Sequence, residues 1–574
     1  MGIEEDEAAR AAENTILRET DNGYRVLGAP KQSVTHQHDI DRIPEFNVTD
    51  ELLKQSGTNS ESWLMYGGCY EQHRYTTADI MIPETMTNSP ELEYTISLSS
   101  GSSMQGSPLI VPSFRGGPPI MYQSNGPNHV KAIDAREGEI LWSFTYAVPS
   151  DLILCCDDSS RGVAVRHDKV YMATLDSGII ALDRYTGEGV WYASTADHKL
   201  GYSATWAPIV YNGKVFTGSA GGEYGVRGFH TALDAQTGDE VWFTNTSPKR
   251  EWVGDSIYQS SATNWTSPTI DSNRGYIYLP TGNPGPVHDG SVRPGPNRNS
   301  CGTLALDINT GERLWFHQES PHDLWDYDSS CPRVLIRDLH FPHRKETKDV
   351  IVNAGKTGWS YTTDAESGEL VVRSEPGVQQ INMYTMIPHI DEGRRLPFMP
   401  GAVGGNNWQP PTYNRETGLI YYKMNNSPSE AWWRFEEYEE GRKYWGGILE
   451  DETESIPYDY NGHISAIVAI DPTTGKRIWR DWVDSDLYLW GGMLSTATGL
   501  VFAGTQNGNL VCFDGETGDR LWEYDLGPTP VSGDPISWYD PGTEKQYIAV
   551  QIGGSGWLRR GQRDDRLAVF SMKS

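Results

Sequence analysis

The sequence predicts an all-β fold, and three observations support this prediction. Glycine (60), proline (34), tryptophan (20) and tyrosine (30) are plentiful among the 574 residues, and such a composition favours short strands and many turns over long helices. From Trp63 onward, short apolar runs alternate with clusters of Gly, Pro, Asn and Asp. A turn motif that ends in tryptophan recurs along the chain, which is the signature of a repeat architecture.

The first 47 residues differ from the rest and are expected to form a peripheral or partly disordered extension. They are charged and poor in strand formers, and Glu4 to Ile16 is a candidate short helix. The acidic start lacks the basic region and apolar core of a secretory signal, so no such signal is visible, and the chain is expected to be either a processed form or cytoplasmic. No run of about 18 apolar residues occurs, so no helical membrane span is expected either.

The repeated motif reads Ala-x-Asp-x-x-Thr-Gly-x-x-x-Trp. Five copies match, the first with Glu137 in place of Thr, and a sixth has Cys512 in place of Ala. Two degraded copies lack the tryptophan and carry Val372 or Tyr422 there. Every copy has glycine four residues after its Asp or Asn, and these positions are Asp134, Asp183, Asp234, Asp307, Asp364, Asn414, Asp471 and Asp514.

This spacing predicts a hairpin turn in each repeat. The Asp or Asn side chain can bond backbone groups of the turn, the glycine takes the positive φ, and the tryptophan begins the returning strand. The distance between copies suits one four-stranded sheet per repeat. Residues 48–574 are therefore expected to form an eight-bladed β-propeller. A single sheet cannot bury its own tryptophan, so each ring is expected to pack against the neighbouring blade.

The net charge and the cysteine pattern exclude some classes of binding partner and cofactor. A formal net charge of −30 argues against nucleic acid and anionic membranes, which are polyanions, and it would suit a basic protein. An excess of acidic residues is also what a protein needs to stay solvated in concentrated salt, although many ordinary acidic proteins have the same excess. Of the six cysteines, Cys155 and Cys156 are adjacent, and the absence of Cys-x-x-Cys-His excludes a c-type haem on this chain.

In the segment from Pro321 to Asp328, Asp326 and Asp328 are two residues apart. In an extended backbone, alternate side chains project the same way, so these carboxylates could converge on one cation or one acidic proton. In a chain with 77 acidic residues, the alternative is a pair of solvated turn residues.

Several motifs in residues 48–574 resemble those of the quinoprotein alcohol dehydrogenases, eight-bladed propellers that bind pyrroloquinoline quinone (PQQ). Cys155-Cys156-Asp157 followed by Arg161-Gly162 resembles the family segment with a disulfide between neighbouring residues. Two buried free thiols are the alternative. Thr263-Asn-Trp265 resembles the segment whose indole stacks on the other face of the quinone.

The resemblance also implies the remaining cofactor and metal residues. Glu223, in a Gly-rich loop, and Asn283, in Thr281-Gly-Asn-Pro, match the carboxylate and amide ligands of a calcium-like cation. The other positions implied to contact the cofactor are Gln105, Arg161, Thr205, Ala220, Gly221, Gly222, Lys356, Asn407 and Trp490. Taken singly, each of these residues has an ordinary structural explanation, such as a turn, a core ring or a surface charge.

In this resemblance Asp326 matches the catalytic base and Lys356 the group that stabilises negative charge on the quinone oxygens. Asp328 stands where lanthanide-using members carry an aspartate and calcium-using members a small residue. Because Coulomb attraction grows with the product of the charges, Asp328 favours a lanthanide. Gln105, Ala220 and Lys356 depart from the methanol-oxidising members, so the alcohol is left open.

The expected activity is oxidation of an alcohol to an aldehyde, with electrons passed to a separate acceptor such as a cytochrome or other redox protein. Two alternatives are a calcium-dependent PQQ sugar or polyol dehydrogenase and a non-catalytic propeller scaffold. The resemblance implies work outside the cytoplasmic membrane, and it leaves a homodimer open. A Cys301–Cys331 bridge beside the active-site loop is a further hypothesis.

Overall fold

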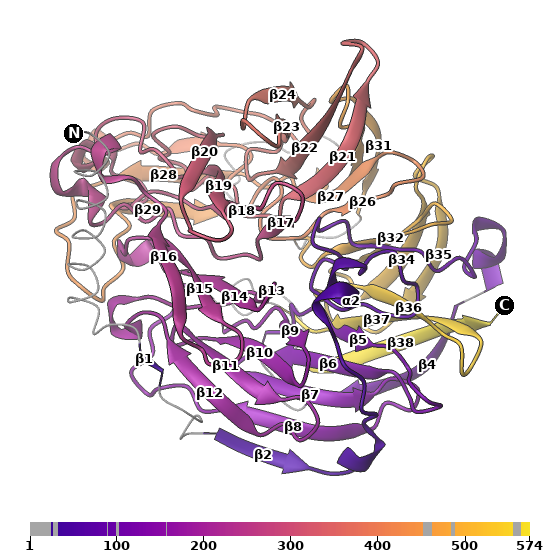
Figure 1. The fold of residues 1–574 in the computed structure, drawn as a ribbon. Helices are drawn as coiled ribbons and strands as arrows, with labels where there is room; N and C mark the ends of the chain where they lie inside the picture. The colour runs from indigo at the N-terminus through magenta and orange to yellow at the C-terminus, as the bar shows by residue number, and fades with distance from the viewer. Residues whose placement is uncertain are drawn as a thin grey trace.

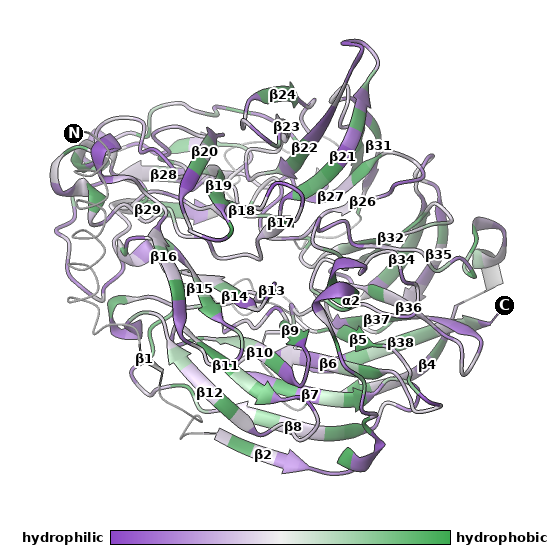
Figure 2. Ribbon diagram, in the orientation of Figure 1, coloured by the Kyte–Doolittle hydropathy of each residue, from purple (hydrophilic) through white to green (hydrophobic). Residues whose placement is uncertain are grey.

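The computed structural model describes residues 25–26, 33–88, 90–98, 103–156, 158–451, 462–483, 488–554 and 564–573. Within these ranges the fold is an all-β propeller whose sheets follow one another around a common centre (Figure 1). Hydrophobic residues lie mainly along the strands, and many loops are hydrophilic (Figure 2). Among the residues described, no helix has the length and apolar character needed to cross a membrane.

Eight sheets have four or five strands in the described ranges. The first four contain β5 (Leu109–Val111), β6 (Ile120–Asn125), β7 (His129–Asp134) and β8 (Ile140–Tyr146); β9 (Val163–Arg166), β10 (Lys169–Thr174), β11 (Gly178–Asp183) and β12 (Gly189–Ser194); β13 (Ile209–Tyr211), β14 (Lys214–Gly218), β15 (Phe229–Asp234) and β16 (Glu240–Asn245); and β17 (Thr269–Asp271), β18 (Tyr276–Thr281), β19 (Gly302–Asp307) and β20 (Arg313–Gln318).

The other four sheets lie mostly in the second half of the chain. They contain β21 (Val334–Phe341), β22 (Glu346–Ala354), β23 (Ser360–Asp364) and β24 (Leu370–Arg373); β26 (Thr412–Tyr413), β27 (Ile420–Asn425), β30 (Ser465–Ile470) and β31 (Arg477–Trp482); β3 (Tyr75–Thr76), β32 (Met493–Thr496), β33 (Leu500–Gly504), β34 (Asn509–Asp514) and β35 (Arg520–Asp525); and β36 (Ile536–Asp540), β37 (Lys545–Ile552), β38 (Arg566–Lys573) and β4 (Glu91–Ser97).

Helical structure in the described residues is short and lies in the connections. It comprises α2 (Asp50–Lys54) and the 3-10 turns η1 (Ile40–Arg42), η2 (Pro83–Asn88), η3 (His198–Leu200), η4 (Gly222–Tyr224), η5 (Lys249–Glu251), η6 (Gly254–Ile257), η7 (Gly290–Val292) and η8 (Ile390–Glu392).

The N-terminal extension contributes two strands to the outer edges of the first sheets. β2 (Ser33–Gln37) pairs with β8, and β1 (Arg25–Val26) pairs with β12. The candidate helix from Glu4 to Ile16 lies outside the described residues. The extension is therefore attached to the sheets by backbone pairing, which its composition did not indicate.

The turn motif forms the predicted hairpin. In the first copy, Asp134 Oδ1 accepts the backbone N–H groups of Arg136 (2.9 Å) and Glu137 (3.2 Å), and Gly138 has φ +75°. The tryptophans pack across the gap between sheets, as predicted. A Cβ on Gly187 would lie 2.6 Å from the Trp142 ring of the preceding sheet, and Trp142 Nε1 donates to the Arg184 carbonyl (3.1 Å).

One copy of the motif is not a separate repeat. Asn414 lies in the turn between β26 and β27, the first hairpin of its sheet, whereas Asp471 lies in the last hairpin of the same sheet, between β30 and β31. The sequence prediction of one sheet per motif is therefore wrong at Asn414. The last sheet carries no copy of the motif, because its outer strand β4 comes from the other end of the chain and pairs with β38.

The longest insertion lies inside this Asn414 sheet and the connection before it. A three-stranded sheet of β25 (Leu396–Phe398), β28 (Ser429–Trp433) and β29 (Gly447–Asp451) lies apart from the sheets of the ring. The chain between β28 and β29, residues 434–446, is called the strap below.

A segment near the N-terminus, Trp63–Thr76, ties the sheets together. Its backbone is hydrogen bonded to the first strands of five sheets, through Ile110, Ile270, Leu335, Tyr413 and Ser495. The fully buried Arg74 side chain also donates to the carbonyls of Tyr66 (2.6 Å), Met493 (2.9 Å) and Pro535 (2.8 Å). The segment therefore links strands that are far apart in the sequence.

Candidate functional site

The predicted site residues come from loops at one face of the propeller. They lie in the connections between successive sheets, as Arg161 and Trp265 do, or between the second and third strands of a sheet, as Glu223 and Lys356 do. In an antiparallel four-stranded sheet these two kinds of connection leave from the same end of the sheet. Residues separated by hundreds of positions in the sequence are brought together in this way.

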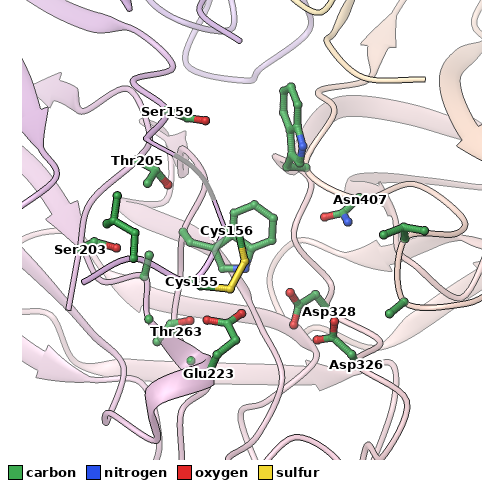
Figure 3. A pocket seen from close by; sticks show the side chains of 18 of the residues that line it. Cys155, Cys156, Ser159, Ser203, Thr205, Glu223, Thr263, Asp326, Asp328 and Asn407 are labelled. Atoms are coloured by element: carbon green, nitrogen blue, oxygen red, sulfur yellow. A yellow bond between two sulfur atoms is a disulfide. The ribbon is translucent and has the colours of Figure 1, made fainter. Parts of the chain in front are cut away.

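These residues line one cavity of about 140 Å³ (Figure 3). That volume is on the order of ten water-sized spaces, enough for a compact planar ligand. The predicted residues that line it are Gln105, Cys155, Cys156, Arg161, Thr205, Ala220, Gly221, Gly222, Glu223, Trp265, Asp326, Asp328, Lys356, Asn407 and Trp490. Asn283 lies just behind the lining and donates its backbone N–H to Asp328 Oδ1.

Cys155 and Cys156 form a disulfide at one side of the cavity (Figure 3). The predicted pairing of adjacent cysteines is confirmed. The Lys443 ammonium group of the strap donates to the Cys155 carbonyl (3.0 Å) and so ties the strap to this turn.

Glu223 lies next to the disulfide, at the centre of η4. Gly221 (φ +104°) and Gly225 (φ +64°) flank this short turn, and a Cβ on Gly221 would lie 2.1 Å from the Gly201 carbonyl oxygen. Glycine is therefore required for the loop to approach its neighbour. Burial raises the pKa of Glu223, and the nearby Asp328 carboxylate raises it further.

The sulfur atoms of Cys155 and Cys156 and a carboxylate oxygen of Glu223 lie within 4.8 Å of one another. The two sulfurs are bonded to each other, so neither is the thiolate that ligates metals. The anionic donor in this group is Glu223.

Lys356 connects Asp326 and Asp328. Its Nζ atom lies 3.1 Å from Asp326 Oδ2 and 3.3 Å from Asp328 Oδ2. Burial raises the pKa of Asp326 strongly, Lys356 opposes this shift, and Asp328 and Glu223 add to it. Burial by itself lowers the pKa of Lys356, but Asp326 and Asp328 outweigh it, so the net shift is upward.

The backbone at Asp326 is not extended, contrary to the sequence prediction. Asp326 has φ +65°, in the left-handed region, and the segment around it forms no strand. The two carboxylates still converge, because the Lys356 ammonium group lies between them rather than because of alternation along a strand.

A second polar group surrounds Arg161. Its guanidinium donates to Thr205 Oγ1 (2.9 Å) and Gln105 Oε1 (2.8 Å), and its Cζ atom lies 4.6 Å from the centre of the Trp408 ring and 5.6 Å from that of Trp265. A guanidinium held in place by acceptors and aromatic rings suits a carboxylate on a planar ligand.

The chemistry of this cavity fits a metal ion and a planar acid. Glu223, Asp326 and Asp328 supply three carboxylates to the lining, against the ammonium group of Lys356, and the Asn283 Oδ1 atom would lie 3.1 Å from a Cβ on Gly222 of the lining. Such an excess of hard oxygen donors suits a cation of calcium or lanthanide type. The disulfide, Trp265 and Arg161 would hold PQQ.

Several lining residues were not predicted from the sequence. Trp408 stacks on Trp490 with ring centres 6.1 Å apart and planes 11° apart, and Thr263 and Ser159 add hydroxyl groups. Trp408 directly follows Asn407, and Thr263 begins the Trp265 motif, so position next to a predicted residue is the signal that could have found them.

Trp445 also lines the cavity, and it comes from the strap. The neighbouring Tyr444 donates its backbone N–H to the Glu223 carbonyl (2.6 Å), and the Trp445 carbonyl accepts from the His288 backbone (2.8 Å). Nothing in the repeat pattern marks this segment, because it belongs to the insertion.

The hypothesis of a Cys301–Cys331 bridge is wrong. Both are buried free thiols, as are Cys69 and Cys512. Cys331 Sγ donates to the Ala354 carbonyl (3.0 Å), and burial raises the pKa of the Cys331 thiol to about 12. These thiols are therefore inert at neutral pH.

Comparison with known proteins identifies relatives over most of the chain. Residues 63–387 match the family described as "Glucose/ethanol/alcohol dehydrogenase, beta-propeller domain". Residues 464–544 match the family described as "Outer membrane protein assembly factor BamB". The chain is 32% identical to the quinoprotein alcohol dehydrogenase PedH of Pseudomonas putida, over 89% of each chain.

Two further relatives are methanol dehydrogenases. The chain is 31% identical to the lanthanide-dependent methanol dehydrogenase of Methylacidiphilum fumariolicum, over 89% of this chain and 87% of that one. Among solved structures, a europium-containing methanol dehydrogenase superposes with a TM-score of 0.83 and 27% identity, covering 91% of this chain and 100% of that one.

Proposed function

The chain belongs to the quinoprotein, PQQ-dependent, alcohol dehydrogenase family, and from that premise we propose that it oxidises an alcohol to an aldehyde with Asp326 as the base. The observation that carries the proposal is the convergence of Glu223, Asp326, Asp328 and Lys356 on the cavity that the disulfide lines.

Asp326 is suited to remove the hydroxyl proton of the alcohol. Burial raises the pKa of this carboxyl group, which makes its ionised form a stronger base than an exposed aspartate. Lys356, 3.1 Å away, keeps the group available in the ionised form and balances its charge. A positioned base of this kind contributes about 10² to 10⁴ in rate.

The other residues hold the reactants in place. When bound, PQQ would supply the carbonyl group that takes up electrons from the alcohol, and the metal would supply Lewis acidity. Glu223, Asn283, Asp326 and Asp328 would hold the metal. Arg161, Thr205 and Gln105 would bind the carboxylates of PQQ, and Lys356 would stabilise negative charge on its quinone oxygens.

We further propose that the metal is a lanthanide. Asp328 adds a carboxylate beside Asp326, and its Oδ1 atom is held by the Asn283 N–H so that the group stays directed at the cavity. A trivalent ion gains more from this extra charge than calcium does. The lanthanide-dependent relative and the europium-containing neighbour support this choice for the chain.

The test is alcohol-dependent dye reduction by protein reconstituted with PQQ and either lanthanum or calcium. We expect lanthanum to support at least tenfold more activity than calcium, and Asp328→Ala to remove the lanthanum activity. The metal assignment fails if calcium serves equally well or if Asp328→Ala keeps its lanthanum activity. Primary alcohols are expected to be better substrates than sugars, and the reverse result would favour the sugar or polyol dehydrogenase.

The match of residues 464–544 to an assembly factor favours a second candidate, a non-catalytic scaffold. That match covers repeats that both classes share, whereas the disulfide and Glu223 lie outside it. The scaffold would be favoured if the protein with added PQQ showed neither quinone absorbance nor dye reduction with any metal.

The organisation and context of the enzyme follow from the same premise. We propose that the eight sheets are blades of one eight-bladed propeller of residues 48–574, with residues 1–47 as its extension. Electrons would leave to a separate redox protein, and the Cys155–Cys156 disulfide supports a place of work outside the cytoplasm. A homodimer stays open.

A further inference from the structure

Asp323 is a buried carboxylate close to the cavity that the proposed reaction does not use. Its side chain is fully buried and lies three residues before Asp326. Asp323 Oδ2 accepts the backbone N–H of Tyr327 (3.0 Å), and Oδ1 accepts that of Trp325 (3.4 Å). The carboxylate therefore bonds the residues on both sides of Asp326.

The geometry of Asp326 needs such support. A non-glycine residue with φ +65° has an unfavourable backbone conformation, which costs about 1 to 2 kcal/mol in an L-amino acid. Such a residue keeps its conformation only when the surroundings fix it. The Tyr327 N–H bonded by Asp323 belongs to the peptide unit that directly follows this strained residue, and the Trp325 N–H belongs to the unit between Leu324 and Trp325.

The flanking side chains are anchored away from the cavity. Trp325 and Tyr327 lie in one hydrophobic cluster with Phe398, with their rings stacked at 5.9 Å. Trp325 Nε1 donates to the Thr385 carbonyl (3.0 Å), and the Tyr327 hydroxyl donates to that of Pro400 (2.7 Å). Of residues 325–327, only Asp326 lines the cavity, and it lies between two anchored aromatic residues.

The main chain at Asp323 is held separately from its side chain. The buried Arg293 guanidinium donates to the Asp323 carbonyl (2.5 Å) and to the carbonyls of Pro286 (2.8 Å) and Val287 (2.9 Å). Removal of the Asp323 carboxylate would leave this anchor in place. Its effect would fall on residues 325–327.

We infer that Asp323 is a positioning residue, whose carboxylate fixes the peptide units around Asp326 and so aims the Asp326 carboxylate at the alcohol. This inference rests on the proposed role of Asp326 as the base. Misplacement of a catalytic group by about 1 Å can cost on the order of 10²-fold in rate.

The test compares Asp323→Asn with a matched control, Asp176→Asn. The amide in Asp323→Asn keeps the shape of the side chain, but its NH₂ group would face a backbone N–H donor, so one of the two bonds must break. Asp176 is also buried and accepts two hydrogen bonds, from Tyr146 (2.8 Å) and Tyr192 (3.0 Å), but it does not line the cavity.

In protein reconstituted with PQQ and lanthanum, we expect Asp323→Asn to lower kcat at least about tenfold. Its KM and the affinity for PQQ should stay within about twofold, and Asp176→Asn should keep the kcat of the wild type. In the Asp326→Ala background, Asp323→Asn should cause no further loss, because it acts through Asp326.

A second measurement needs neither cofactor nor activity. Hydrogen–deuterium exchange of the peptide covering residues 321–328 should be at least about tenfold faster in Asp323→Asn than in the wild type, because either the Trp325 or the Tyr327 N–H group loses its acceptor. Asp176→Asn should leave this peptide unchanged.

The outcomes separate this inference from the proposed function. Wild-type activity in Asp326→Ala would overturn both. An inactive Asp326→Ala together with a fully active Asp323→Asn, or with unchanged exchange at residues 321–328, would overturn the positioning role alone. So would a further loss when Asp323→Asn is added to Asp326→Ala.

Discussion

At the scale of single residues, His288 links the strap to the segment that carries Asp326. Its Nδ1 atom lies 2.9 Å from the Leu324 carbonyl oxygen, which can only accept, so Nδ1 carries the proton. The ring stacks on Trp445 with centres 6.0 Å apart and planes 16° apart. Burial lowers the pKa of His288 to about 4, although the Leu324 carbonyl opposes this shift.

This histidine makes the fold sensitive to acid. The unfolded chain binds the proton near pH 6.5, whereas the folded chain binds it near pH 4. The contribution of neutral His288 to the free energy of unfolding is therefore fully present above pH 6.5. It is lost as the pH falls from 6.5 towards 4, and the loss reaches about 3 kcal/mol. His288→Gln, which keeps a donor for Leu324, should flatten the dependence of urea unfolding between pH 7 and pH 4.5.

The control for this prediction is His36→Gln at an exposed position. It should keep the steep dependence of the wild type. If His288→Gln and His36→Gln show the same slope, the buried neutral state of His288 does not contribute to the acid sensitivity.

The site residues that the sequence predicted are those inside recognisable motifs. Cys155, Glu223, Trp265 and Asp326 each lie in a short run of characteristic residues, and all of them line the cavity. Trp445 lies in an insertion without a repeat, and only the three-dimensional path of the strap brings it to the cavity. Asp323 lies within a quoted segment, but its role depends on hydrogen bonds that spacing does not reveal.

At the scale of elements, the turn between the last two strands of a sheet depends on a glycine beneath a tryptophan. Gly238 has φ +80°, and a Cβ there would lie 2.8 Å from the Trp191 ring. Gly275, in the turn between β17 and β18, has a similar φ of +72°, but the nearest atom to a Cβ lies 3.8 Å away. Comparing the two glycines therefore separates the cost of a left-handed backbone, which both share, from the cost of contact with a tryptophan ring, which only Gly238 has.

We expect Gly238→Ala to destabilise the protein by about 1 to 3 kcal/mol more than Gly275→Ala, because only the former displaces a buried ring. Both substitutions share the cost of a left-handed alanine, about 1 kcal/mol. Urea unfolding of the two variants measures the difference. Equal losses would mean that the tryptophan does not depend on close contact with the turn.

The copy of the turn motif at Asn414 shows what a local pattern cannot determine. Asn414 Oδ1 accepts the backbone N–H groups of Glu416 (2.8 Å) and Thr417 (3.2 Å), as the aspartate does in the other copies. The turn chemistry was therefore predicted correctly. Which two strands the turn connects depends on pairings such as β27 with β30, across an insertion whose length gives no sign of them.

At the scale of the whole molecule, the net charge of −30 acts on the folded state. Part of it is locally balanced, for example where Arg42 contacts Asp134, Glu137 and Glu139. The remaining like charges repel one another in the compact state more than in the expanded chain.

Added salt should therefore stabilise the protein. Raising KCl from about 0.1 M to about 1 M shortens the screening length from about 10 Å to about 3 Å, so the thermal midpoint should rise by several degrees. The salt for this experiment should be a chloride and not a sulfate, because sulfate also strengthens the burial of apolar surface. A midpoint that falls with KCl would show that attractive ion pairs outweigh the repulsion.

The sheet that joins β4 to β36, β37 and β38 also has a consequence for the time course of synthesis. Ile96 of β4 pairs with Leu567 of β38, so 567 − 96 = 471 residues separate the partners. At roughly 5 to 20 residues per second, a ribosome needs about half a minute to a minute and a half to make that length. During this interval β4 has no pairing partner. The sheet can form in full only after β38 has emerged from the ribosome.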